Sequence, residues 1–141
     1  MVRILVVDDD PDILETLRYA FERQGFEVEV ETDGRAALAR ARQQPPDLAV
    51  LDVMLPGLNG YEVSRLLKDD MQSGRLPAFR ILMLTARRVS SGARQEFLAT
   101  WSRADATMWK PYDLGLLMFR VRELLEPAPR EAPATPVGEG S

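Results

Sequence analysis

Short apolar runs alternate along the chain with longer segments in which apolar residues recur every three or four positions. Runs of about five residues bounded by turn-forming residues are typical of buried strands, and the segments between them have the period of amphipathic helices. The pattern predicts an α/β fold: a flavodoxin-like, doubly wound, five-stranded parallel sheet in the order 2-1-3-4-5, with helices on both faces. The predicted strands are residues 3–7, 26–31, 48–52, 80–85 and 106–109.

Polar residues at the boundaries of the helical segments indicate where the helices begin. Aspartate is a favoured N-cap because its side chain accepts a backbone hydrogen bond in the first turn, and proline suits the first helical position. The strand at 26–31 alternates apolar residues with three glutamates, which is typical of an edge strand. The expected caps are Asp10, which Pro11 follows, Asp33 and Asp113, and two more helices are expected at 60–71 and 90–103.

The last predicted helix carries a regular apolar stripe, and the composition changes after it. Residues 127–141 are rich in proline, alanine, glutamate and glycine, which cannot form a core of their own. We therefore expect one domain over residues 1–126 and a flexible C-terminal tail or truncated linker over 127–141. The stripe consists of Leu114, Leu117, Met118, Val121, Leu124 and Leu125.

Composition narrows the classes of function. The 141 residues, 45% of them hydrophobic, suit a single core, and the formal net charge of −4 offers no basic field to nucleic acid. The lack of cysteine and histidine removes thiolate and imidazole ligands and the commonest general base. We expect neither a signal peptide nor a membrane span, because the apolar runs are short. We expect a cytoplasmic protein without direct nucleic-acid or membrane binding.

Four predicted strands end in polar residues that would meet at one edge of the sheet. Asp8 and Asp9 follow the first strand, and Asp52 ends the third. Thr85 ends the fourth strand, and Lys110 follows the fifth. In this sheet order, ligands bind in the crevice beside the carboxyl ends of the first and third strands. Neighbouring carboxylates raise one another's pKa, and a hard divalent cation removes that repulsion, so the all-oxygen set indicates Mg²⁺.

Asp52 is the candidate nucleophile of this set. A carboxylate beside Mg²⁺ can attack phosphorus and form an aspartyl-phosphate. Because the transferred group carries charged oxygens, catalysis then depends on positioning and charge neutralisation. Lys110 would supply a cation, and Thr85 would supply a hydroxyl group for a phosphoryl oxygen.

The strand-end segments read VVDDDP at 6–11, LDVMLPGLNG at 51–60, MLTA at 83–86 and WKPY at 109–112. In this order they resemble the CheY-like receiver domain of bacterial two-component response regulators. The resemblance implies a phosphorelay protein in which Asp52 takes a phosphoryl group from a sensor histidine kinase or a phosphotransfer protein. It implies signalling through protein–protein contacts. It also implies no enzyme activity beyond the protein's own phosphorylation and dephosphorylation.

The resemblance further implies a role for each site residue and a cis peptide bond between Lys110 and Pro111. In the family, the side chains two positions after the acceptor and after the threonine tune hydrolysis, so Met54 and Arg87 are expected to slow the loss of phosphate. Asp8 would hold the metal through water. The implied site comprises the acceptor Asp52 with Thr85 and Lys110, and the Mg²⁺ ligands Asp8, Asp9, Asp52 and the backbone carbonyl of Met54.

One position departs from the family pattern and keeps an alternative open. Thr107 stands where the family has an aromatic switch residue, so a pseudo-receiver, acting as a phosphorylation-independent interaction module, is the second hypothesis. A phosphohydrolase of the haloacid dehalogenase kind is disfavoured, because its second acid is replaced by Met54. The expected partners include a downstream protein or output domain. A homodimer would use the face of the fourth helix, fifth strand and fifth helix, with Trp109, Leu116 and Phe119.

Overall fold

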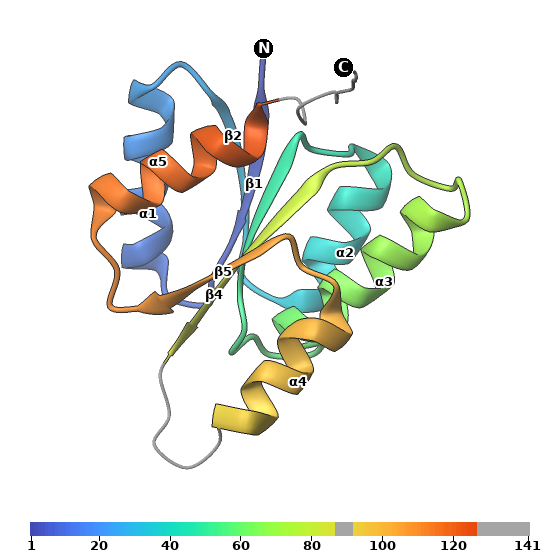
Figure 1. The fold of residues 1–141 in the computed structure, drawn as a ribbon. Helices are drawn as coiled ribbons and strands as arrows, with labels where there is room; N and C mark the ends of the chain where they lie inside the picture. Colours follow the sequence, from blue (N-terminus) through green and yellow to red (C-terminus); the bar gives the residue numbers. More distant parts are fainter. Residues whose placement is uncertain (87–91, 127–141) are drawn as a thin grey trace, which may run out of the picture.

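The computed structural model describes residues 1–86 and 92–126 and contains a five-stranded parallel sheet between two layers of helices (Figure 1). The strand order is β2-β1-β3-β4-β5, and each neighbouring pair is parallel. This confirms the predicted flavodoxin-like order. The strands are β1 (Arg3–Val7), β2 (Glu27–Glu31), β3 (Leu48–Asp52), β4 (Arg80–Ala86) and β5 (Ala106–Lys110).

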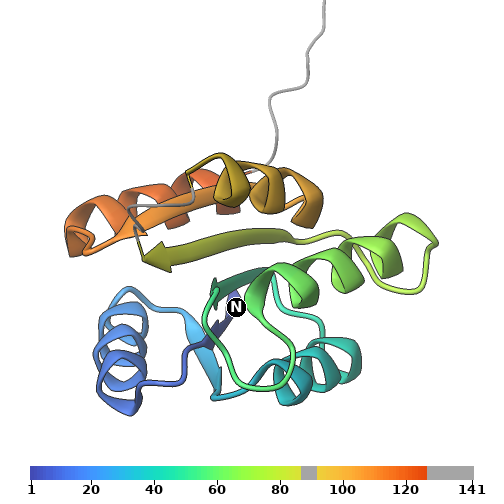
Figure 2. The ribbon, with the colours of Figure 1, turned by 90° about the horizontal axis from the view of Figure 1, so that it is seen from below.

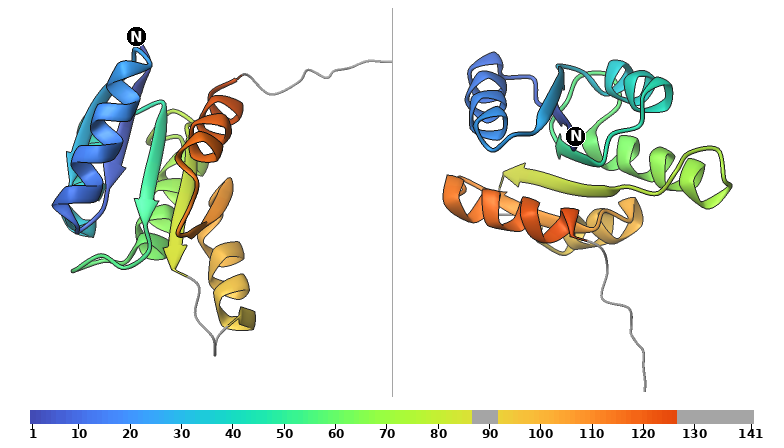
Figure 3. Two further views of the ribbon diagram at one scale, coloured as in Figure 1. Left: turned by 90° about the vertical axis from the view of Figure 1, so that its left-hand side faces the viewer. Right: turned by 90° about the horizontal axis from the view of Figure 1, so that it is seen from above.

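Helices cover both faces of the sheet. α1 and α5 lie on one face, and α2, α3 and α4 lie on the other (Figures 1 and 3). The predicted start of the fourth helix, at residue 90, falls outside the described residues. None of the described helices is long and apolar enough to cross a membrane. The helices are α1 (Pro11–Arg23), α2 (Gly34–Gln43), α3 (Gly60–Gln72), α4 (Gly92–Ser102) and α5 (Leu114–Leu125).

Alternation along the strands divides the core into two clusters. In β1, Leu5 and Val7 belong to the cluster under α2, α3 and α4, whereas Ile4 and Val6 belong to the cluster under α1 and α5. All five residues of β3 are buried, because helices cover both faces of this central strand. The strand that carries Asp52 is therefore held on every side.

The predicted helix caps are confirmed. The side chains of Asp10, Asp33 and Asp113 each accept a backbone hydrogen bond at the start of α1, α2 and α5. The predicted stripe of α5 is wrong at one end: Leu114, the first residue of the helix, is 39% exposed and borders a groove between α1 and α5. A position in the first turn lies at the edge of the covered surface, so helical periodicity alone does not bury it.

The predicted edge strand is confirmed, and its glutamates are paired. Glu29 and Glu31 of β2 form ion pairs with Arg40 of α2, and Glu27 lies 3.6 Å from the Arg3 guanidinium. These pairs lie on the face covered by α2, while Val28 packs on the opposite face. The sheet therefore ends in a charged row rather than an apolar one.

A buried carboxylate joins α2 to the end of α3. The Asp70 side chain accepts hydrogen bonds from Arg42 at 2.7 Å and from Arg75 at 3.0 Å. The hydrogen bond from Arg42 lowers the pKa of Asp70, burial opposes this, and Arg75 lowers the pKa further. The ionised form of Asp70 therefore stabilises the fold.

We predict that Asp70→Asn lowers the free energy of unfolding by about 1–3 kcal/mol, because two arginines lose a buried anionic partner. Urea denaturation measures this. The stabilisation is present above about pH 4, the ordinary aspartate range, and is lost as pH falls through the lowered pKa of the folded state. The difference between native and variant protein should therefore narrow in acid.

The matched control is Glu123→Gln, which removes an exposed partner 3.7 Å from Arg120 on α5. Its effect should stay within about 0.5 kcal/mol, because surface pairs contribute little. Equal effects of the two substitutions would contradict the structural role given to Asp70.

Candidate functional site

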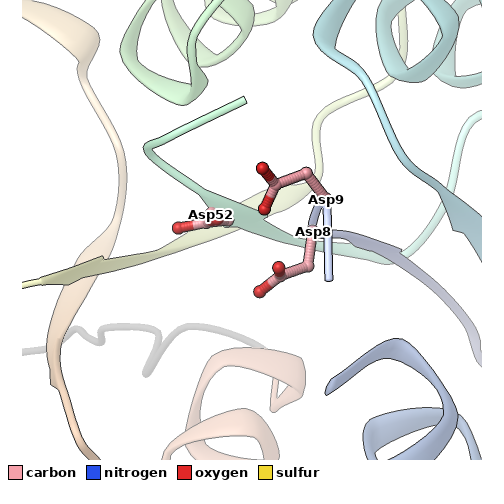
Figure 4. Close-up of side chains that lie close together, drawn as sticks. All are labelled: Asp8, Asp9 and Asp52. Atoms are coloured by element: carbon pink, nitrogen blue, oxygen red, sulfur yellow. The ribbon is translucent and has the colours of Figure 1, made fainter. Parts of the chain in front are cut away.

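Carboxylates from two neighbouring strands converge at the carboxyl edge of the sheet. Asp8 and Asp9 directly follow β1, and Asp52 is the last residue of β3. One oxygen from each of the three carboxylates lies within 4.8 Å of the others, and Figure 4 shows the three side chains around one space. Asp8 and Asp52 are 1% and 4% exposed, whereas Asp9 is open to solvent. The predicted acidic cluster is therefore brought together.

Strand register places the other predicted residues at the same edge, which faces the viewer in Figure 2. Asp52 is level with Leu84, so Thr85 lies one residue further along β4, and Lys110 of β5 is level with Ala86. Thr85 is 2% exposed. Parallel strands thus carry an acid, a hydroxyl group and a cation to one crevice, as expected for this sheet order.

Lys110 bridges the two buried carboxylates. Its ammonium nitrogen Nζ lies 3.2 Å from Asp8 Oδ2 and 3.2 Å from Asp52 Oδ1. The other oxygen of Asp8, Oδ1, accepts the backbone N–H of Asp10 at 2.9 Å, which fixes the orientation of the carboxylate. The Lys110–Pro111 peptide bond is cis, which confirms the expectation from the resemblance.

The site holds more negative than positive charge. Burial raises the pKa of Asp52, and the Asp8 charge raises it further, while Lys110 and the backbone amide of Met54 oppose the shift. Burial lowers the pKa of Lys110, but the Asp52 and Asp8 charges outweigh it, so the pKa of Lys110 is raised and the ammonium form is retained. Three carboxylates beside a single ammonium group fit a site for Mg²⁺, which prefers carboxylate ligands.

A cavity of about 700 Å³ opens beside the acidic cluster. Its walls include Asp9 and Thr85, together with Met54, Arg94 and Gln95. The Met54 side chain is 52% exposed at the mouth of the site. Met54 is therefore a part of the cavity wall that is open to solvent beside the acidic cluster.

Two residues at the ends of the quoted motifs contribute to the site in ways not anticipated from the sequence. A Cβ atom on Gly60 would lie 2.3 Å from the backbone carbonyl oxygen of Asp52, so only glycine lets α3 begin this close to the end of β3. Burial raises the pKa of Tyr112; the Lys110 charge opposes the shift, and the Asp8 and Asp52 charges add to it, so the hydroxyl group keeps its proton. Both residues lie inside the quoted motifs, but spacing alone did not indicate these contacts.

Thr107 lies away from the acidic cluster. It is exposed on β5, and its neighbour Met108 packs into the core on the other face of the sheet. Trp109, two residues further on, is half-buried on the same face as Thr107. Position 107 therefore offers a short polar side chain at the surface.

Comparison with known proteins identifies the family. The family model for the response regulator receiver domain matches residues 4–122. The chain therefore belongs to the response regulator receiver domain family. This confirms the resemblance found in the strand-end motifs.

Curated relatives extend beyond this chain. It is 43% identical over 123 residues to the DNA-binding response regulator MtrA of Mycolicibacterium smegmatis, covering 87% of this chain and 50% of that protein. It is 41% identical over 133 residues to the phosphate regulon transcriptional regulatory protein PhoB of Rhizobium meliloti, covering 94% of this chain and 56% of that protein. The chain thus spans about half the length of these relatives.

Solved structures with a similar fold belong to the same family. A receiver domain of a signal transduction histidine kinase from Syntrophus aciditrophicus is 28% identical, with a TM-score of 0.81, covering 96% of this chain and 98% of that one. The chemotaxis protein CheY4 of Vibrio cholerae is 28% identical, with a TM-score of 0.74, covering 88% and 98%. The fold of this chain is that of a whole receiver domain.

The expectation of no direct nucleic-acid binding conflicts with these findings. It rested on the net charge of −4, yet a relative at 43% identity is named a DNA-binding response regulator. The charge of a receiver does not report what a regulator containing it binds, so the expectation is wrong as a statement about the family.

We predict that Asp52→Asn raises the free energy of unfolding in metal-free buffer by on the order of 1 kcal/mol, because a neutral amide avoids the cost of burying an ion beside Asp8. Thermal or urea unfolding in EDTA measures this. The raised pKa means that ionised Asp52 destabilises the fold at neutral pH. The free energy of unfolding of the native protein should therefore rise as pH falls through that pKa, and the difference between native protein and variant should shrink.

Added Mg²⁺ should stabilise the native protein more than Asp52→Asn, and Lys110→Met should destabilise the metal-free protein. A variant less stable than the native protein in EDTA would contradict the charge balance described for this site.

Proposed function

We propose that Asp52 accepts a phosphoryl group from a phosphohistidine on a sensor histidine kinase or phosphotransfer protein, and that the modified domain then changes its contacts with a downstream partner. The observation that carries this proposal is the position of Asp52, a buried carboxylate held by Lys110 beside two more acids. Membership of the receiver family supports it. A cytoplasmic location remains a prediction from the sequence.

The proposed reaction is a transfer between two nucleophiles. An Asp52 carboxylate oxygen bonds to phosphorus as the phosphorus–nitrogen bond of the donor breaks, and the imidazole leaves with the electron pair. Asp9, Asp52 and the backbone carbonyl of Met54 would hold Mg²⁺ directly, and Asp8 would hold it through water. Bound Mg²⁺ would offset the negative charge that gathers around the transferred group.

Lys110 and Thr85 would stabilise the product. Lys110 already contacts Asp52, and its raised pKa keeps it charged, so its ammonium group can pair with a phosphoryl oxygen. Thr85 is buried one residue beyond the level of Asp52 and can donate its hydroxyl group. The complete set of acids, hydroxyl group and lysine favours phosphorylation over the pseudo-receiver alternative. It also suits a domain that phosphorylates and dephosphorylates only itself.

The downstream partner is proposed to be a protein or an output domain. Relatives named as DNA-binding regulators make a DNA-binding output the first to test. The proposed docking or homodimer face lies on α4, β5 and α5. There Leu116 and Phe119 are 48% and 58% exposed and Trp109 is half-buried.

We expect incubation with acetyl phosphate and Mg²⁺ to add a single phosphoryl group, measured by intact-mass analysis. Asp52→Asn should abolish the adduct, because the nucleophile is lost, and EDTA should abolish it by removing the metal. Lys110→Met should reduce it strongly. An Asp113→Asn variant, changed only at the cap of α5, should be labelled like the native protein. No adduct under any condition would favour the pseudo-receiver.

We expect Met54→Asn to speed the loss of the phosphoryl group by roughly tenfold, equivalent to about 1.4 kcal/mol of barrier. An amide at the mouth of the site can orient a water molecule in line with the phosphorus–oxygen bond, whereas the apolar thioether cannot. Time-resolved intact mass after removal of the donor measures this. A native protein that loses phosphate as fast as the variant would contradict it. Arg87, the other residue expected to slow hydrolysis, lies outside the described residues.

A further inference from the structure

The loop from β3 to α3 carries Met54, whose backbone carbonyl is a proposed ligand of Mg²⁺. Hydrogen bonds fix the start of this loop: the Val53 N–H group donates to the Leu84 carbonyl oxygen at 3.0 Å, and the Val53 carbonyl oxygen accepts the Leu55 N–H group at 3.0 Å. Met54 is therefore the middle residue of a tight turn. Its position depends on how the residues that follow the turn are held.

Those following residues lie against the first turn of α2. The N–H group of Gly34, the first residue of α2, donates to the carbonyl oxygen of Pro56 at 3.1 Å. A Cβ atom on Gly34 would lie only 1.8 Å from the carbonyl oxygen of Leu58. The backbones of the helix and the loop are therefore in direct contact, and only a residue without a side chain leaves room for that contact.

In a second contact between the two segments, the loop supplies the glycine. A Cβ atom on Gly57 would lie 3.6 Å from Arg35 Cγ and 3.9 Å from Arg35 Cδ, so the aliphatic part of the Arg35 side chain lies over this residue. Two consecutive residues of α2 thus contact three consecutive residues of the loop, Pro56, Gly57 and Leu58. The loop that carries Met54 is held by a helix that contributes no carboxylate to the acidic cluster.

The helix is held more firmly than the loop that lies against it. Asp33 caps the amino end of α2, and Arg40 forms ion pairs with two glutamates of β2. In the loop, Met54 and Pro56 are exposed. A side chain introduced at Gly34 would therefore displace the loop rather than the helix.

We propose that Gly34 and Arg35 are positioning residues for the Mg²⁺ site, because they hold the loop against α2 and so place the Met54 carbonyl oxygen where the metal binds. The inference rests on the proposed Mg²⁺ site and adds a support that lies outside it. Met54 lies two residues before Pro56, the acceptor of the Gly34 hydrogen bond, so a displacement at Pro56 reaches Met54 through a short piece of chain.

The test is isothermal titration calorimetry of Mg²⁺ into the metal-free whole chain, for the native protein, Gly34→Ala and Gly74→Ala. Gly74 is the matched control: its φ is 82°, and an added Cβ would meet no atom within 4 Å. Alanine there strains the backbone after the carboxyl end of α3, whereas the site lies at the amino end of that helix. The free energy of unfolding in EDTA is measured for each protein, which separates a loss of metal affinity from a loss of stability.

We expect Gly34→Ala to raise the dissociation constant of Mg²⁺ by roughly tenfold or more, as is usual when the support of a metal ligand is lost. Gly74→Ala should bind Mg²⁺ like the native protein, although it too should be less stable. Saturating Mg²⁺ should restore labelling of Asp52 by acetyl phosphate in Gly34→Ala, because the acceptor itself is unchanged.

Native-like affinity in Gly34→Ala would overturn the positioning role while leaving the proposed phosphorylation of Asp52 in place. An equal loss of affinity in Gly74→Ala would overturn it as well, since the effect would then follow stability alone. Labelling that saturating Mg²⁺ does not restore would also count against it. Failure of the native protein to bind Mg²⁺ would overturn both this inference and the proposed metal site.

A second pair of variants tests the same contact without adding atoms, and it serves even if Gly34→Ala does not fold. Arg35→Ala removes the aliphatic part that lies over Gly57, whereas Arg35→Met removes the charge and keeps an unbranched side chain there. Because the change in charge is the same, we expect the affinity for Mg²⁺ to be a few-fold weaker in Arg35→Ala than in Arg35→Met. Equal affinities in this pair would contradict the proposal.

Discussion

The arrangement at the carboxyl edge of the sheet depends on one unfavourable interaction, the repulsion between buried carboxylates. Asp8 and Asp52 are both removed from water, and a single ammonium group 3.2 Å from each offsets their charges. The compensation is incomplete, because the pKa of Asp52 stays raised by burial and by Asp8. The surplus negative charge of the site attracts a divalent cation. It also favours binding of a group whose oxygens can pair with Lys110.

The rest of the fold keeps these charges from moving apart. β3 is buried along its whole length, and α3 begins directly against it because Gly60 has no side chain. A carboxylate on such a strand cannot relax into solvent without disturbing both core clusters. The cost of burying charge is therefore carried by packing elsewhere, as is common where proteins place strained or ionised groups for function.

Local sequence signals predicted much of this structure. The strand order, the edge strand, the three aspartate caps and the convergence of Asp8, Asp9, Asp52 and Lys110 all follow from periodicity and strand-end chemistry. The hydrogen bond from Gln95 to the Ala86 carbonyl oxygen was not predictable, because it depends on where α4 sits. That helix has the weakest amphipathic pattern of the five described helices. The hydrogen bonds from Arg65 to the Trp101 carbonyl oxygen, and from Arg103 to side chains of α3, were missed for the same reason. Leu114 was misplaced because periodicity does not show where a covering surface ends.

The two edges of the sheet differ in how they would meet another copy of the chain. The β2 edge carries glutamates held in place by Arg3 and Arg40, whereas β5 at the other edge carries Thr107 and Trp109. At high protein concentration, strand-to-strand stacking through β2 would bring like charges together and is disfavoured. The charged row on β2 therefore opposes edge-to-edge pairing at that border of the sheet, whereas the surface of β5 with Thr107 and Trp109 carries no such row.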